Sequence, residues 1–62
     1  MKIQFVSKRY PEAKPLHEAE AQGVPRPRDY VTVPGYRETV VDRVLWVYPP
    51  DGGEPSVVVV LG

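Results

Sequence analysis

The residues of this sequence that could carry acid–base or metal chemistry are few. His17, Glu18 and Glu20 lie close together in the segment PLHEAEAQ, and His17 is the only histidine in the 62 residues. A zinc site needs several histidine or cysteine ligands, and the chain has no cysteine. On a helix, Glu20 would lie three residues from His17, whereas Glu18 would point elsewhere. We therefore expect solvent-exposed charge here, with no metal and no cofactor.

Nucleophilic and phosphate-binding motifs do not occur either. Ser7 and Ser56 are the only serines, and neither lies in the Gly-x-Ser-x-Gly turn of a hydrolase. Gly52 and Gly53 lack the lysine and the following helix of a phosphate-binding loop, so we interpret them as a turn. The sequence therefore predicts a protein that is not an enzyme.

Aromatic and arginine side chains give a stronger signal, because both are common in binding surfaces. Rings beside arginines can stack on nucleic-acid bases, and the same groups form hot spots for protein partners. A purely structural role is the alternative, with Trp46 in the core and the tyrosines at the sheet edge. The candidate partner-binding rings are Tyr30, Tyr36, Trp46 and Tyr48, and the candidate phosphate-binding arginines are Arg26, Arg28, Arg37 and Arg43.

The charge pattern favours protein contact over nucleic acid. The formal net charge is zero, and a dedicated nucleic-acid binder is usually more basic. Asp29, Glu38 and Asp42 balance the neighbouring arginines. Lys8 and Arg9 belong to an acid-free stretch at the start of the chain. With some of the later arginines, they could still form a local basic patch.

Five short strands and one helix are expected to position these residues. Residues 2–7 alternate between apolar and polar and predict a strand, which Pro11 ends. Residues 15–22 predict a helix, since Pro15 suits a first helical turn and Gly23 suits the position after the last turn. The remaining strands are expected at 29–33, 37–41, 44–48 and 56–61.

The segment before the last turn is ambiguous. Its apolar residues follow a helical spacing, but Thr39, Val40 and Val41 are β-branched and favour a strand. On the strand interpretation, a bulge near Asp42 and Arg43 changes the apolar face. The turn PPDGGEP then predicts a hairpin between the last two strands.

This order of strands and turns resembles the SH3-like small β-barrels, a group that includes KOW and Tudor modules. The matching residues are DYVTVPG (29–35), TVVDRVLWVY (39–48) and SVVVVL (56–61), about half of the chain. The resemblance implies a mainly β, five-stranded SH3-like barrel or bent antiparallel sheet. The short helix expected at 15–22, in the first long connection, is not a standard feature of such modules. The small size and the lack of a catalytic motif also resemble short accessory proteins of bacteriophages.

The final strand, SVVVVL, is apolar on both faces, whereas a strand of a small sheet usually alternates. One expected cover is the helix 15–22, laid across the outer face. The other is a second chain or a protein partner, because a last strand can be a sheet edge and edges pair with edges. Val58 and Val60 are therefore candidate partner-binding residues.

The sequence thus predicts a single small domain that binds without catalysis. The first hypothesis is a protein-interaction module, such as a phage-type accessory protein that acts on a host protein. The alternatives are a nucleic-acid-binding barrel that uses the arginines, and a homo-oligomer that pairs through Val57–Leu61. No run approaches the roughly 20 apolar residues of a membrane span. The lack of cysteine fits the cytoplasm, which is the expected location.

Overall fold

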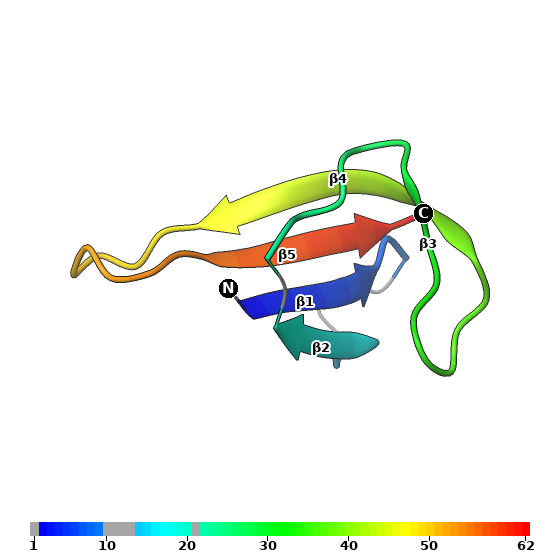
Figure 1. Ribbon diagram of the computed structural model, residues 1–62, viewed down its shortest axis with the longest axis horizontal. Helices are drawn as coiled ribbons and strands as arrows, with labels where there is room; N and C mark the ends of the chain where they lie inside the picture. Colours follow the sequence, from blue (N-terminus) through cyan, green and yellow to red (C-terminus); the bar gives the residue numbers. More distant parts are fainter. Residues whose placement is uncertain (1, 10–13, 21) are drawn as a thin grey trace.

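The computed structural model describes residues 2–9, 14–20 and 22–62, which form a curled five-stranded sheet (Figure 1). This half-barrel is compatible with the expected SH3-like barrel, and the described residues contain no helix. The order across the sheet is β2-β1-β5-β4-β3. The strands are β1 (Lys2–Ser7), β2 (His17–Glu20), β3 (Tyr30–Val31), β4 (Thr39–Val47) and β5 (Ser56–Leu61).

β5 is the central strand of the sheet. It pairs in parallel with β1 and antiparallel with β4, so Val59 lies between Phe5 and Val44. The prediction that residues 57–61 form a sheet edge is wrong, because hydrogen-bonded neighbours occupy both sides of this strand. The central position also accounts for the composition, since a strand covered on both faces needs apolar residues on both. Four β5 side chains are at most 1% exposed: Val57, Val59, Val60 and Leu61.

One face of the sheet carries the main hydrophobic core. The core residues are Ile3, Phe5, Val33, Val41, Val57, Val59 and Leu61. The connection between β2 and β3 crosses this face in front of the central strands (Figure 1), and its Val24 packs against the core. An extended, proline-containing segment therefore provides the cover, and the expected helical cover is wrong.

β2 replaces the helix predicted for residues 15–22. It pairs antiparallel with β1, with Ala19 opposite Ile3 and His17 opposite Phe5. An eight-residue helix makes about two turns and is marginal in water, whereas the free edge of β1 offers backbone partners. The alternation in β2 fits this pairing, since its first and third residues are half-buried and its second and fourth are exposed. Pro11 and Ala21, which entered the predictions for this region, lie outside the described residues.

β4 is one long strand with a bulge, so the strand interpretation of the ambiguous segment is confirmed. Its pairing with β5 shifts register at Asp42. Before the bulge, Val41 faces the core opposite Leu61; after it, Val44 and Trp46 take the core face. The antiparallel hairpin of β4 and β5 is confirmed as well.

β3 is shorter than the predicted strand at 29–33, and two turns explain its length. Tyr36 N donates to Val33 O at 3.1 Å, with Gly35 at a φ of 78°. Proline followed by a residue of positive φ is the pattern of a type II turn. The turn Arg26–Asp29 has the same form, with Arg28 at a φ of 76° and a 3.0 Å hydrogen bond from Asp29 N to Arg26 O. These turns limit the ladder between β3 and β4 to two residue pairs.

Candidate functional site

Large apolar side chains are exposed along the second half of β4. Leu45 is 44% exposed, Trp46 47%, Val47 48% and Tyr48 71%. We call these four residues the hairpin patch. They lie where the β4–β5 hairpin extends beyond the other strands (Figure 1). Because consecutive residues of a strand point to opposite faces, the hairpin patch presents apolar surface on both faces.

Trp46 is a surface residue at the end of the sheet. In the pairing of β4 with β5 it lies opposite Val57, which is 0% exposed. Almost half of its surface is still open to solvent. Leu45 lies on the other face opposite the half-buried Val58.

The edge of β4 beside the hairpin patch is open. On this side, Val41 N donates to Asp29 O at 2.8 Å, and Arg28 N donates to Val41 O at 2.9 Å. Beyond Val41, no described residue pairs with this side of β4. Residues 43–47 form an open strand segment that carries only one charge, on Arg43. Open edges of this kind accept further strands.

The opposite edge of the sheet is protected by charge. β2 is only four residues long and directs Glu18 and Glu20 to solvent. Gln4 Nε2 donates to a Glu18 oxygen at 2.8 Å, and Lys2 Nζ lies 3.7 Å from the same carboxylate. This hydrogen bond and the positive charge of Lys2 lower the pKa of Glu18 below its ordinary value. Short, charged edge strands resist pairing, so the β4 edge is the more receptive of the two.

The predicted partner-binding residues fall into three groups. Trp46, Tyr48 and Val58 lie together on the hairpin. Tyr30, 73% exposed, belongs to β3, and Tyr36, 37% exposed, follows the Pro34–Gly35 turn. Val60 is 1% exposed and therefore belongs to the interior. Sequence reasoning missed Leu45 and Val47; the consecutive apolar letters LWVY were the available signal.

The four candidate arginines come from three parts of the fold. Arg26 and Arg28 lie in the turn before β3, Arg37 lies in the loop before β4, and Arg43 lies on β4 opposite Val60. Arg37 shares a hollow with Lys8 and Arg9, as the possible basic patch anticipated.

That hollow lies at the ends of β1 and β5, away from the hairpin patch. Its volume is about 740 Å³. It combines cationic side chains with the half-buried Leu16 and the ring of Tyr36. The lining residues are Ser7, Lys8, Arg9, Leu16, Tyr36, Arg37, Leu61 and Gly62.

The segment that first suggested acid–base chemistry has a structural role. The ring of His17 packs against that of Phe5 at 6.1 Å between centroids. Within residues 2–9, 14–20 and 22–62, no three histidine, aspartate or glutamate side chains gather in an arrangement that could hold a metal ion. In the same residues, no helix is long and apolar enough to cross a membrane.

Comparisons with known proteins give no match. No family model fits the chain. Neither the curated proteins nor the solved structures provide a significant relative.

Proposed function

We propose that this protein is a non-enzymatic interaction module that binds a partner protein through the hairpin patch. The exposure of four consecutive large apolar residues, between 44 and 71% each, carries the proposal. Contiguous exposed apolar surface marks interaction sites in folded proteins. Tryptophan and tyrosine are enriched among the residues that dominate binding energy, and the hairpin patch contains one of each.

The open edge of β4 suggests how the partner engages. Among the described residues, none pairs with the backbone donors and acceptors that residues 43–47 offer on this edge, beside the hairpin patch. An extended segment of the partner adds to this edge as a further strand, the recognition mode called β-augmentation. Its side chains then contact Trp46 on one face and Leu45 on the other, and an acidic residue suits Arg43. In this proposal the chain is a phage-type accessory protein that occupies a host protein's surface in the cytoplasm.

Selection from a random peptide display library tests this proposal. Peptides are selected against the immobilised protein, and their affinity is measured for the wild type, Trp46→Ala and an Arg26→Gln/Arg28→Gln double variant. We expect Trp46→Ala to weaken binding at least tenfold, because a central hot-spot tryptophan contributes 2 kcal/mol or more, roughly thirtyfold in affinity. The double variant serves as the matched control and keeps its affinity.

The salt dependence of binding separates protein recognition from nucleic-acid recognition. Affinity for a nucleic acid falls steeply with salt, since cationic side chains displace counterions from phosphates. We expect a weak salt dependence for the selected peptides. Loss of binding in the arginine double variant beside an unaffected Trp46→Ala variant would contradict the proposal.

A second copy of this chain is the second candidate partner, and the unprotected β4 edge favours it. Antiparallel pairing about a two-fold axis at Leu45 places Val44 opposite Trp46 and Arg43 opposite Val47. No like charges oppose each other in this register, and aromatic–aliphatic pairs stabilise cross-strand contacts. Self-association through β4 would replace the predicted pairing through Val57–Leu61, whose backbone is already paired on both sides.

Sedimentation velocity across a wide concentration range tests self-association. Pairing through β4 predicts a dimer that Val47→Lys abolishes, because the lysines would lie opposite Arg43 of the other copy. A Lys substitution at Glu20, on the opposite edge, is the matched control and leaves the dimer intact. A strictly monomeric mass at the highest concentration would remove this candidate.

A further inference from the structure

The hollow at the ends of β1 and β5 has the composition of a ligand site. Four segments build it: the end of β1 with the residues after it, Leu16 before β2, the loop before β4 and the end of β5. Its volume of about 740 Å³ falls within the range of small-molecule pockets, which is roughly 300–1,000 Å³. The half-buried Leu16 supplies apolar surface, and Tyr36, 37% exposed, adds a ring.

The described side chains that line the hollow carry charge of one sign. Lys8, Arg9 and Arg37 are among them, and within the part of the chain that the structure describes no aspartate or glutamate side chain lines the hollow. This differs from the chain as a whole, whose formal net charge is zero. Like charges that line one hollow raise the local concentration of ions of the opposite sign.

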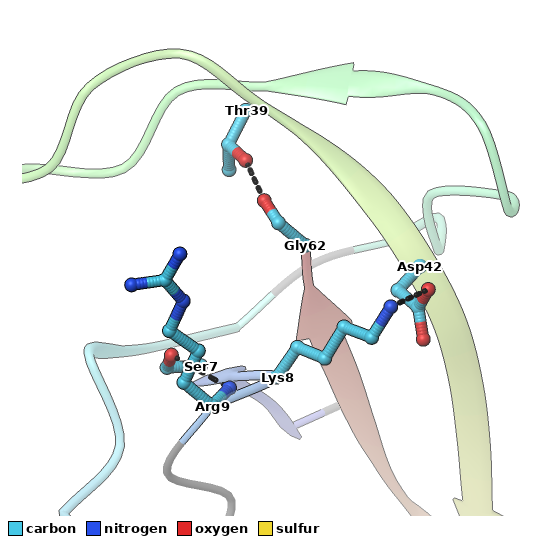
Figure 2. Close-up of polar contacts among 6 residues, drawn as sticks. All are labelled: Ser7, Lys8, Arg9, Thr39, Asp42 and Gly62. Carbon is cyan, nitrogen blue, oxygen red and sulfur yellow. Dashed lines mark hydrogen bonds and ion pairs between the residues drawn. The ribbon is translucent and has the colours of Figure 1, made fainter.

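Two of the three cations are available to a ligand. Lys8 Nζ lies 3.4 Å from Asp42 Oδ1, so its charge is already paired. Figure 2 shows the side chains of Lys8 and Arg9 running in different directions, Lys8 toward Asp42 and Arg9 away from it. Within the described part of the chain, neither Arg9 nor Arg37 forms an ion pair.

The remaining polar groups of the hollow are held in place within the chain. Thr39 Oγ1 donates to Gly62 O at 2.5 Å, which gives that oxygen a partner (Figure 2). Arg9 N donates to Ser7 Oγ at 3.2 Å and fixes the start of the segment that carries the guanidinium group. Among the described residues of the hollow, Arg9 and Arg37 are therefore the cationic side chains that have no partner within the described part of the chain.

We infer that this hollow binds a small phosphorylated molecule. A guanidinium group presents its donors in a planar fork that matches two phosphate oxygens, and two such forks can hold one phosphate. Tyr36 and Leu16 provide the apolar surface for the organic part of the ligand. The site lies outside the hairpin patch, so this inference does not depend on the proposed function.

Nuclear magnetic resonance titration of the full-length, ¹⁵N-labelled chain tests the inference. The probes are inorganic phosphate, phenyl phosphate and acetate, each added at constant ionic strength. We expect saturable shifts at the amides of Ser7, Lys8, Arg9 and Arg37 and at the side-chain Nε–H groups of the two arginines. Phenyl phosphate binds at least as tightly as inorganic phosphate, because its ring contacts the apolar surface.

Charge-removing variants identify the residues responsible. Arg9→Gln and Arg37→Gln each weaken phenyl phosphate binding by about tenfold or more, as expected for a lost charge-assisted hydrogen bond. Arg43→Gln removes the same charge outside the hollow and is the matched control, and Trp46→Ala also leaves binding unchanged. Unchanged dispersion of the amide spectrum verifies that each variant is folded.

Three results would overturn the inference. One is the absence of saturable shifts with either phosphate compound, which would show that the guanidinium groups are neutralised within the chain. The second is an equal loss of affinity in Arg43→Gln, which would indicate diffuse attraction to positive charge. The third is equally tight binding of acetate, which would exclude specificity for phosphate.

Discussion

The burial of neighbouring valines in β5 shows which faces of this central strand are covered. Val59 faces the core and is 0% exposed. Val60 points to the opposite face, yet it is only 1% exposed, whereas Val58 on that same face is half-buried. The ion pair between Lys8 and Asp42 joins the segment after β1 to β4 and thus spans β5 near Val60. The structure therefore has two covered faces at this end of β5 and one at the hairpin end.

Because these valines differ in burial, alanine substitutions should lower the free energy of unfolding by different amounts. Valine to alanine removes two methyl groups, worth about 0.8 kcal/mol each, and leaves a cavity when the site is buried. We expect Val59→Ala and Val60→Ala each to lower the free energy of unfolding by roughly 2–3 kcal/mol, and Val58→Ala by less than about 1 kcal/mol. A chain of this length has about 3–9 kcal/mol in total, so the first two variants remain only marginally folded.

Urea and thermal unfolding, followed by circular dichroism, measure these changes. One kcal/mol shifts the melting temperature of a domain of this size by about 4–8 °C, so we expect losses of roughly 10–20 °C for the two buried positions. Val58→Ala is the matched control, since it removes the same atoms from the same strand. If Val60→Ala lowered the free energy of unfolding as little as Val58→Ala, the face of β5 opposite the core would be open at Val60, and this reasoning would be refuted.

Three further predictions concern the edges and turns of the sheet. The side-chain resonances of Glu18 should titrate below the ordinary pKa of a glutamate, and Gln4→Ala should raise that pKa more than Lys2→Met does. Because the folded-state pKa is lowered, the ionised Glu18 stabilises the fold at a pH above the unfolded-state pKa. This stabilisation is lost as the pH falls through the folded-state pKa. Arg28→Gly should raise the melting temperature by a few degrees, because a φ of 76° costs a non-glycine residue about 1 kcal/mol, whereas Arg26→Gly should not raise it. Amide hydrogen exchange should be slowest in β5 and fast in β2, and similar rates in the two strands would contradict the central position of β5.

Local patterns were sufficient to predict several elements of the fold. β1 follows from the alternation in residues 2–7, and the β4–β5 hairpin follows from the proline and glycine turn between two apolar runs. The bulge near Asp42 was predictable as well, because β-branched residues favoured a strand while the apolar spacing changed face. Each of these signals lies within about ten residues of the chain.

The elements that sequence reasoning missed depend on distant partners. Residues 17–20 have good helical propensity, but a tertiary partner, the free edge of β1, determines their conformation. The alternation of His17, Glu18, Ala19 and Glu20 was the one local sign of a strand. The parallel pairing of β5 with β1 joins segments some 50 residues apart, and no local pattern specifies which segment covers β5.

The candidate sites show the same division. The consecutive apolar residues LWVY indicated an unusual surface, and in the structure they are exposed at the projecting end of the hairpin. Val60 looks equivalent to Val58 in the sequence, but in the fold Val60 lies beside the buried Val6 and near the Lys8–Asp42 ion pair, whereas Val58 lies beside Gln4. Arg9 and Arg37 are 28 positions apart, so their shared hollow follows from the fold and from no motif.

The central claim is that the hairpin patch is a protein-binding surface, and the most direct test is an amide chemical-shift map of the ¹⁵N-labelled protein with a selected peptide. The spectra are recorded at low and at high salt, and short single-stranded and double-stranded oligonucleotides are added in parallel. The account predicts shifts concentrated at residues 43–48 and the facing part of β5, unchanged at high salt, with no response to oligonucleotides. Shifts confined to the arginines, produced by oligonucleotides and lost at high salt, would contradict the account and establish a nucleic-acid-binding protein.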